Sequence, residues 1–170
     1  MSDDDSTKDF NTAVFAMQVV VVALAAGIVM FAGFVSFQYG LDVDDLGMKG
    51  YFSWMAIGMG VVGLALSRVV PRFLPREGPL ASNVVAKPGE AGLRQRLLAG
   101  MTLRLVVGAA FCEGMAFLNI AALMIEHSTP CLGMALLLML AVLVLFPTKS
   151  SVAASLEEAE RAVREEGRWK

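Results

Sequence analysis

An uninterrupted apolar run near the N-terminus constrains this chain more than any other feature. Residues 13–37 (AVFAMQVVVVALAAGIVMFAGFVSF) contain no charged side chain in 25 residues. A helix of that length is about 37 Å long, which exceeds the roughly 30 Å hydrocarbon core of a bilayer. The preceding segment, MSDDDSTKD, is acidic, unlike the start of a cleavable signal peptide, so the run predicts a retained membrane span.

Three more apolar runs follow, at about residues 51–70, 103–125 and 131–146. With 56% hydrophobic residues and a mean hydropathy of +0.64, the chain is more apolar than soluble domains. The third and fourth runs are separated by the short link from His127 to Pro130, so they must form a tight helical hairpin. We therefore predict an all-α integral membrane four-helix bundle, made of two helical hairpins, over residues 13–147.

Local signals indicate where the second and fourth spans begin and end. Tyr51 and Trp54 give the second span an aromatic start at one interface, and Pro71 is expected to end its helix. Thr129 can cap the fourth span, and Pro130 suits its first turn. The fourth helix is expected to reach about 26 Å, which makes it the shortest of the four spans.

The distribution of Lys and Arg predicts the orientation in the membrane. With four spans, the N-terminus, the loop over residues 71–102 and the tail share one side. Thirteen of the 14 basic residues lie on that side: Lys8, Arg68, Arg72, Arg76, Lys87, Arg94, Arg96, Arg104, Lys149, Arg161, Arg164, Arg168 and Lys170. Lys49 lies opposite, in the acidic loop over residues 38–50. The positive-inside rule then predicts that residues 1–12 and both termini are cytoplasmic, in the inner (plasma) membrane.

The predicted cytoplasmic loop, residues 71–102, has two parts. Residues 71–92 are rich in Pro, Gly and Ala and are expected to be irregular. Residues 93–102 carry an apolar face with Arg94 and Arg96 beside it. Two interpretations stay open: an interfacial helix whose arginines contact anionic lipid headgroups, or a lower extension of the third span.

The tail, residues 148–170, is predicted to be a short cytoplasmic amphipathic helix. Val152, Leu156, Ala159 and Val163 fall on one stripe of that helix. Such a helix either binds a partner or a second copy of the chain, or lies solvated near the membrane.

Glu113 is the residue with the clearest potential for chemistry. It lies ten residues into the third run, close to the middle of the bilayer, where a carboxylate is costly. Intramembrane acids therefore usually face the interior of the bundle, and small residues around this one let a second helix approach closely. Gln18 and Cys112 are candidate partners of Glu113, whereas Asn119 lies almost opposite on the helical wheel.

Two interpretations of Glu113, Asn119 and Gln18 stay open. In the first, these side chains form hydrogen-bonded bridges between helices. In the second, they belong to an intramembrane site that binds a proton or an ion.

Other classes of function lack support in the sequence. No phosphate-binding, metalloprotease or hydrolase motif is present. His127 is the single histidine, and Cys112 and Cys131 are expected at different depths, so neither a metal site nor a disulfide is predicted. The basic residues follow the pattern of inside loops, so nucleic-acid binding is not supported. We expect no enzymatic activity and no cofactor.

The stretch GAAFCEGMAFLNIAAL around Glu113 and the step Phe146-Pro147-Thr148 carry a family resemblance. They resemble a group of small uncharacterised bacterial multi-span membrane proteins, which have Glu-Gly in one span and a Pro-Thr step after the last span. The resemblance covers roughly residues 100–155. It implies a membrane location and no assigned activity.

The same stretch is similar to the proton-carrying helix of rotary ATPase proteolipid subunits, in which a mid-membrane acid lies among small residues. That resemblance implies proton binding at Glu113. The chain departs from that family because its acid lies in the third span. The dense glycine repeat and the polar hairpin loop of the proteolipids are also missing.

We therefore predict a non-enzymatic structural or partner-binding membrane component. Its expected partners are the lipid bilayer and either a second copy of the chain or another membrane protein. The alternative is a proton-coupled small transporter or an ion-handling subunit that uses Glu113.

A topology reporter tests the predicted orientation. Alkaline phosphatase fused after Lys170 is expected to be inactive, because its disulfides form outside the cytoplasm. The same enzyme inserted after Asp45, in the acidic loop, should be active and serves as the control. An active enzyme at Lys170 would place the tail outside and contradict the orientation.

Overall fold

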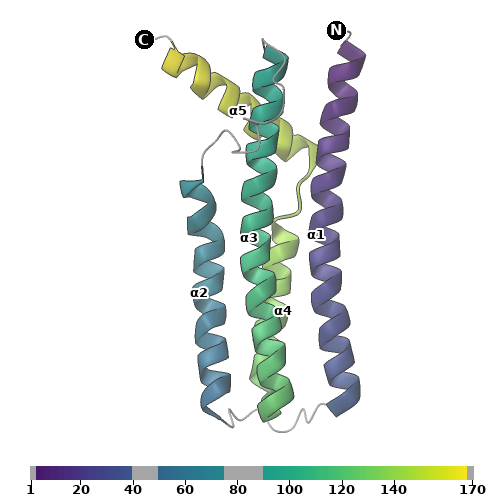
Figure 1. Cartoon of the computed structure of the whole chain (residues 1–170), viewed down its shortest axis with the longest axis vertical. Helices are drawn as coiled ribbons and strands as arrows, with labels where there is room; N and C mark the ends of the chain where they lie inside the picture. The colour runs from purple at the N-terminus through teal and green to yellow at the C-terminus, as the bar shows by residue number, and fades with distance from the viewer. Residues whose placement is uncertain (1–2, 40–49, 75–89, 168–170) are drawn as a thin grey trace.

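The computed structural model describes residues 3–39, 50–74 and 90–167, of which 94% are helical. The helices are α1 (Asp3–Tyr39), α2 (Tyr51–Phe73), α3 (Glu90–Glu126), α4 (Thr129–Val144) and α5 (Lys149–Gly167). Helices α1 to α4 run side by side, and α5 crosses one end of them at a slant (Figure 1). Both chain termini lie at that end. The all-α class predicted from the sequence is confirmed.

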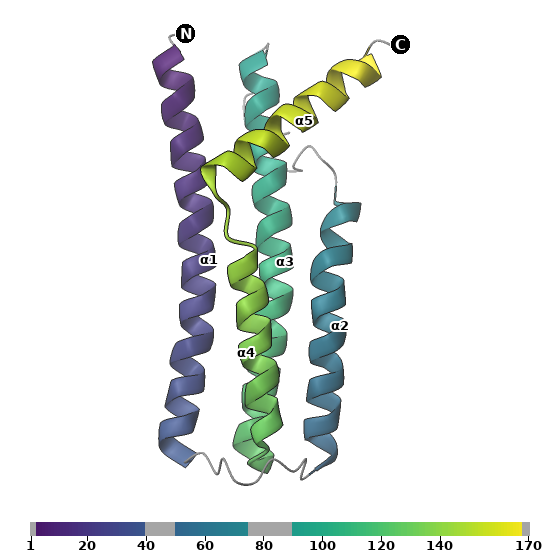
Figure 2. The same ribbon diagram turned by 180° about the vertical axis from the view of Figure 1, so that it is seen from behind.

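Helix α3 is the one that packs against each of the other four. Helix α4 lies behind it in Figure 1 and in front of it in Figure 2, with α1 and α2 on opposite sides of this pair. Among the described residues, α1 and α2 make no contact with each other. Helices α1 and α3 run in the same direction, and α2 and α4 run back.

Helix α2 approaches α3 closely because its buried face carries small residues. The buried positions, spaced three and four residues apart, are Ser53, Ala56, Gly60, Gly63 and Ser67. This spacing forms one stripe along a helix, and small side chains let two helix backbones come near each other. A β-carbon added to Gly63 would lie 2.2 Å from the side chain of Met115 in α3, so the contact is already tight with glycine.

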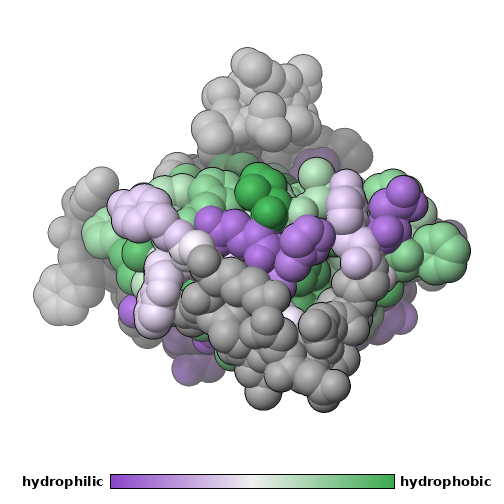
Figure 3. Space-filling model, turned by 90° about the horizontal axis from the view of Figure 1, so that it is seen from below, coloured by the Kyte–Doolittle hydropathy of each residue, from purple (hydrophilic) through white to green (hydrophobic). Residues whose placement is uncertain are grey.

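The turn between α3 and α4 is as short as the sequence predicted. His127 adopts a left-handed conformation (φ 51°), and its N–H donates to the Leu123 carbonyl at 2.9 Å, which closes the end of α3. Ser128 is the N-cap of α4, and a proline follows in the first turn. Thr129, expected to be the cap, is instead the first helical residue. Figure 3 shows this end of the molecule, where hydrophilic residues gather at the centre between apolar helix sides.

Within the described parts of the chain, three segments are long and apolar enough to cross a membrane: Phe10–Tyr39, Tyr51–Phe73 and Leu93–Glu126. Large apolar side chains such as Phe34, Val61 and Leu140 are exposed on the outer faces of the bundle. Such faces favour association in water, whereas in a bilayer they meet acyl chains. Helix α4 has 16 residues and is too short to be counted as a span by itself. It is long enough only if it is joined to Lys149–Ala162, from which it is bent by 64°.

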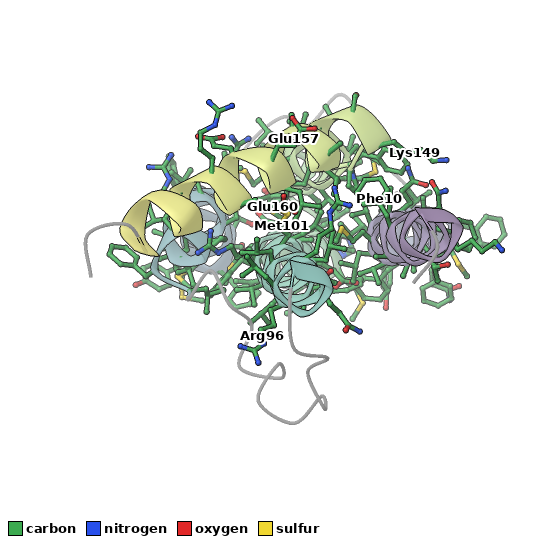
Figure 4. The ribbon with its side chains drawn as sticks, turned by 90° about the horizontal axis from the view of Figure 1, so that it is seen from above. Phe10, Arg96, Met101, Lys149, Glu157 and Glu160 are labelled. Atoms are coloured by element: carbon green, nitrogen blue, oxygen red, sulfur yellow. The ribbon has the colours of Figure 1, made fainter. Side chains whose placement is uncertain are left out.

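Helices α1 and α3 have 37 residues each, so both are about 55 Å long and exceed the hydrocarbon core of a bilayer. Their projecting ends form a second hydrophobic core with α5, separate from the core that α1 to α4 share. Its buried side chains are Val14, Met17, Leu97, Leu98, Val152 and Leu156. An ion pair between Arg94 Nε and Glu160 Oε1, 3.1 Å apart, joins α3 to α5 beside this core. Figure 4 looks down on α5 where it lies across these helix ends.

Several boundaries differ from those expected. Pro71 lies inside α2, which continues to Phe73. A proline removes one backbone donor, and this loss is small when the helix ends within the next turn. Residues 93–102, for which two interpretations were open, continue α3 without a break, and the helix begins at Glu90. Helix α1 begins at Asp3, so the acidic N-terminal segment is largely helical.

Some expectations lie outside the described residues. They include the acidic residues of the loop over 40–49, most of the expected irregular linker (75–89), and the side chain of Val163. The rest of the predicted tail stripe, Val152, Leu156 and Ala159, packs on the second core.

Leu156 is expected to hold α5 on the second core. Leu156→Ala removes a side chain that is 1% exposed, a change that costs about 2–5 kcal/mol. We expect faster amide hydrogen exchange along α5, with little change in α2. Glu157→Ala, on the exposed side of the same turn (Figure 4), is the matched control. Unaltered exchange in α5 of the Leu156 variant would contradict this role.

Candidate functional site

Glu113 lies on the flank of α3 that faces α1. A β-carbon added to Gly27 of α1 would lie 3.4 Å from Glu113 Oε1, so the glycine leaves room for the carboxyl group. Glu113 is half-buried, whereas Cys112 and Ala116 on the same helix are fully buried. The sequence predicted a carboxyl group facing the interior of the bundle. The structure has it at the edge, between α1 and α3.

Glu113 has no hydrogen bond or ion pair to any other described residue. An uncompensated charge or an unbonded carboxyl group in an apolar layer is costly, so this group needs a proton, a hydrogen-bond donor, or both. None of the described residues supplies that donor, whereas water, lipid, a ligand or another protein could. Among the described residues, Ser128 Oγ is also buried without a partner, but Glu113 is the acid of the apolar part of α3.

A groove of about 960 Å³, open to the side, runs between α1 and α3 from the level of Glu113 toward Tyr39. Its walls are Gly27, Met30, Phe31, Phe34, Gly114, Phe117, Leu118 and Ala121. Phe31 and Phe117 meet edge to face, with their ring centroids 5.4 Å apart. The groove is therefore an apolar surface. Glu113 does not line it, but it adjoins two of the lining glycines, Gly114 in sequence and Gly27 across the contact with α1.

Gln18 and Asn119 lie away from this groove. Gln18 Nε2 donates to the Pro147 carbonyl at 2.9 Å, in the stretch between α4 and α5. Gln18 precedes Gly27 by nine residues, which is about 13 Å along α1. Asn119 Nδ2 donates to the Ala56 carbonyl of α2 at 2.9 Å, on the other flank of α3. The residues that the sequence grouped as one candidate site thus belong to separate contacts.

Asn119 joins α3 to α2 from a fully buried position. Its Nδ2 also donates to the Met115 carbonyl of its own helix, at 2.9 Å. Its Oδ1 is buried and has no partner among the described residues. A β-carbon added to Gly60 would lie 3.1 Å from Nδ2, so the glycine leaves the space in which the Asn119 amide group reaches α2.

Glu126 caps the first turn of α2, a role not predicted from the sequence. Its Oε1 accepts a hydrogen bond from the Phe52 N–H at 3.0 Å, and its Oε2 accepts one from the Ser53 N–H at 2.7 Å and one from the Ser53 hydroxyl group. The first amides of a helix lack partners within it, and its positive end favours a negative group. A β-carbon added to Gly50 would lie 2.1 Å from Oε1, so a larger residue there would displace the carboxylate from this position.

A signal for this cap was present in the sequence. The antiparallel arrangement of the predicted spans puts the end of the third beside the start of the second. An acid at the end of the third span and unpaired amides at the start of the second span are complementary.

The described residues contain no group of three or more His, Cys, Asp or Glu side chains that could hold a metal ion. Cys112 and Cys131 are buried and free. No protein-family model, no curated protein and no solved structure matches the chain. We therefore interpret Glu113, Asn119 and Gln18 from their own contacts.

The cap predicts a coupling between Gly50 and Glu126. Gly50→Ala should displace the carboxylate from the α2 amides, and Glu126→Ala removes it, so each is expected to lower the thermal unfolding midpoint of the protein in detergent. Because both changes remove the same hydrogen bonds, the double variant should unfold close to either single variant. Gly33→Ala, whose added β-carbon meets nothing within 4 Å, should not lower the midpoint. Additive losses in the double variant would contradict the coupling.

Proposed function

We propose that this chain is an integral membrane protein with four spans, of which α4 is the shortest. The 16 residues of α4 carry no charge and extend for about 24 Å. The irregular stretch after α4 contains the Pro147 carbonyl that Gln18 bonds. Backbone groups in a bilayer need hydrogen-bond partners, so this bond suits a stretch that completes the span after α4 ends.

The proposed orientation has both termini in the cytoplasm. It is supported by the 13 basic residues that the predicted topology collects on one side of the membrane, against one on the other. In the bundle, Arg72 at the end of α2 and Arg94 near the start of α3 belong to the end that α5 crosses. Arg94 forms an ion pair with Glu160, whereas Arg96 points away from α5 (Figure 4). Of Arg94 and Arg96, the latter is therefore the one proposed to contact an anionic lipid headgroup.

The proposed role is that of a non-enzymatic component that holds a membrane partner against the groove between α1 and α3. The observation that carries this proposal is the unpaired carboxyl group of Glu113 beside that groove. A partner helix that carries a hydrogen-bond donor would supply the bond that Glu113 lacks. The partner is either a second copy of this chain or another membrane protein.

The surface beside Glu113 suits the close approach of a helix. Ala110 and Gly114 lie one turn apart on α3 and are exposed. A β-carbon added to Gly114 would meet nothing within 4 Å, and the same holds for Gly33 on α1. Small residues at such spacing allow backbones to pack with little intervening side-chain volume.

Proton or ion handling is the second candidate function. It is favoured by the lateral opening of the groove at Gly27 and Gly114, the two glycines that adjoin the carboxyl group. An intramembrane acid without a fixed partner can bind and release a proton as such a species comes and goes. Partner binding requires a hydrogen-bonding group at position 113, whereas proton handling requires an acid that can gain and lose a proton.

Substitution of Glu113 separates these two candidates. For partner binding, Glu113→Gln should preserve the assembly extracted from native membranes, because an amide still forms hydrogen bonds. Glu113→Ala should weaken it about fivefold, which corresponds to roughly 1 kcal/mol for one intramembrane hydrogen bond. Native electrophoresis of the mildly solubilised protein measures this. Val61→Ala, on the exposed face of α2, is the control.

For proton handling, Glu113→Gln should abolish proton flux in vesicles and labelling of this residue by dicyclohexylcarbodiimide. An assembly that is insensitive to both substitutions would argue against partner binding at this groove. Flux that persists in Glu113→Gln, or a wild-type protein in which Glu113 is not labelled, would argue against a proton role.

A further inference from the structure

A second cavity, of about 410 Å³, lies between α3 and α5, apart from the groove beside Glu113. It is lined by Leu97, Met101, Arg104, Ser155, Glu158, Ala159 and Ala162. Leu97 and Met101 make one part of the wall apolar, and they also belong to the second core. The polar part contains one cation, Arg104, and one anion, Glu158. The cavity therefore offers an apolar surface beside one positive and one negative group.

The contacts of Arg104 give the depth of the cavity in the membrane. Arg104 Nη2 donates to the carbonyl group of Leu74, the residue that directly follows α2. Helix α2 is one of the candidate spans and ends at Phe73. The cavity therefore begins where a span leaves the apolar layer, and lipid headgroups occupy that level of a bilayer.

Arg104 and Glu158 both retain unused binding capacity. The guanidinium group of Arg104 has five N–H donors, and its Nε is buried without a hydrogen-bond partner among the described residues. Glu158 is exposed, and no ion pair joins it to Arg104. Arg94, by contrast, is already paired with Glu160. Two opposite charges thus line one cavity without neutralising each other.

We infer that this cavity binds the headgroup of a zwitterionic phospholipid, with its phosphate on Arg104 and its primary ammonium group toward Glu158. Guanidinium groups suit phosphate because their N–H groups match its oxygens. A headgroup that carries only negative charge would be repelled by the Glu158 carboxylate, whereas one with both charges complements both side chains. The inference depends on the membrane location of the chain and is independent of the role proposed for Glu113.

Native mass spectrometry of the full-length protein in detergent tests this inference. The protein is titrated with phosphatidylethanolamine and with phosphatidylglycerol of identical acyl chains, and the lipid-bound fractions are compared. We expect the wild type to prefer phosphatidylethanolamine about threefold, the effect of one ion pair at an exposed carboxylate. Glu158→Gln should remove this preference, and Arg104→Gln should weaken the binding of both lipids. Glu157→Gln, an exposed acid of α5 that does not line the cavity (Figure 4), should leave the preference unchanged.

Glu158→Gln is the decisive variant, because Arg104→Gln also removes the bond to Leu74 and can disturb the end of α2. Equal binding of the two lipids by the wild type would overturn the inference, as would a preference that survives Glu158→Gln. Displacement of phosphatidylethanolamine by millimolar inorganic phosphate would identify a site for a free anion and overturn it too. Retention of the preference in phosphate, with its loss in Glu158→Gln, would establish a lipid headgroup site.

Discussion

The close approach of α2 and α3 is the constraint on which the hydrogen bonds between these two helices depend. The small residues along α2 set this distance, and Gly60 and Gly63 allow it where Asn119 and Met115 face them. At a larger separation, Asn119 could not reach the Ala56 carbonyl, and Glu126 could not reach the first amides of α2. These bonds are therefore consequences of the packing, and they in turn fix the register of the two helices. The pair then offers a fixed surface on which α4 packs.

The contact between α1 and α3 differs in kind from this one. Helix α1 buries larger side chains, such as Val21 and Ile28, and meets Glu113 through the space left by Gly27. The groove beside this contact leaves apolar surface and one carboxyl group uncovered. A component that fills the groove would add contacts without breaking the hydrogen bonds between α2 and α3. The looser side of α3 is for this reason the better candidate for binding.

The sequence predicts features that depend on local pattern and misses those that depend on register between distant segments. Hydropathy and residue type predicted the apolar helices, the short turn at His127 and the apolar stripe of the tail. The helical start of α1 was missed because its first turns are acidic. The residues that follow, from Phe10 to Met17, pack in a core shared with α5, more than 130 residues away in the chain. The contacts that Gln18 and Glu126 make were not predicted, for the same reason. Their partners, Pro147 and Ser53, are 129 and 73 residues distant, and no local pattern indicates which backbone groups they meet.

Arg104 and Glu113 occupy the same helix but opposite faces of it. They are nine residues apart, which corresponds to about 13 Å along α3 and about half a turn around its axis. Arg104 faces the end of α2 and the cavity under α5, whereas Glu113 faces α1. A lipid headgroup held at Arg104 would therefore not obstruct a partner at the groove, and occupancy of one site leaves the other open. Because α3 is continuous between these two residues, both proposed sites are positioned by one rigid element.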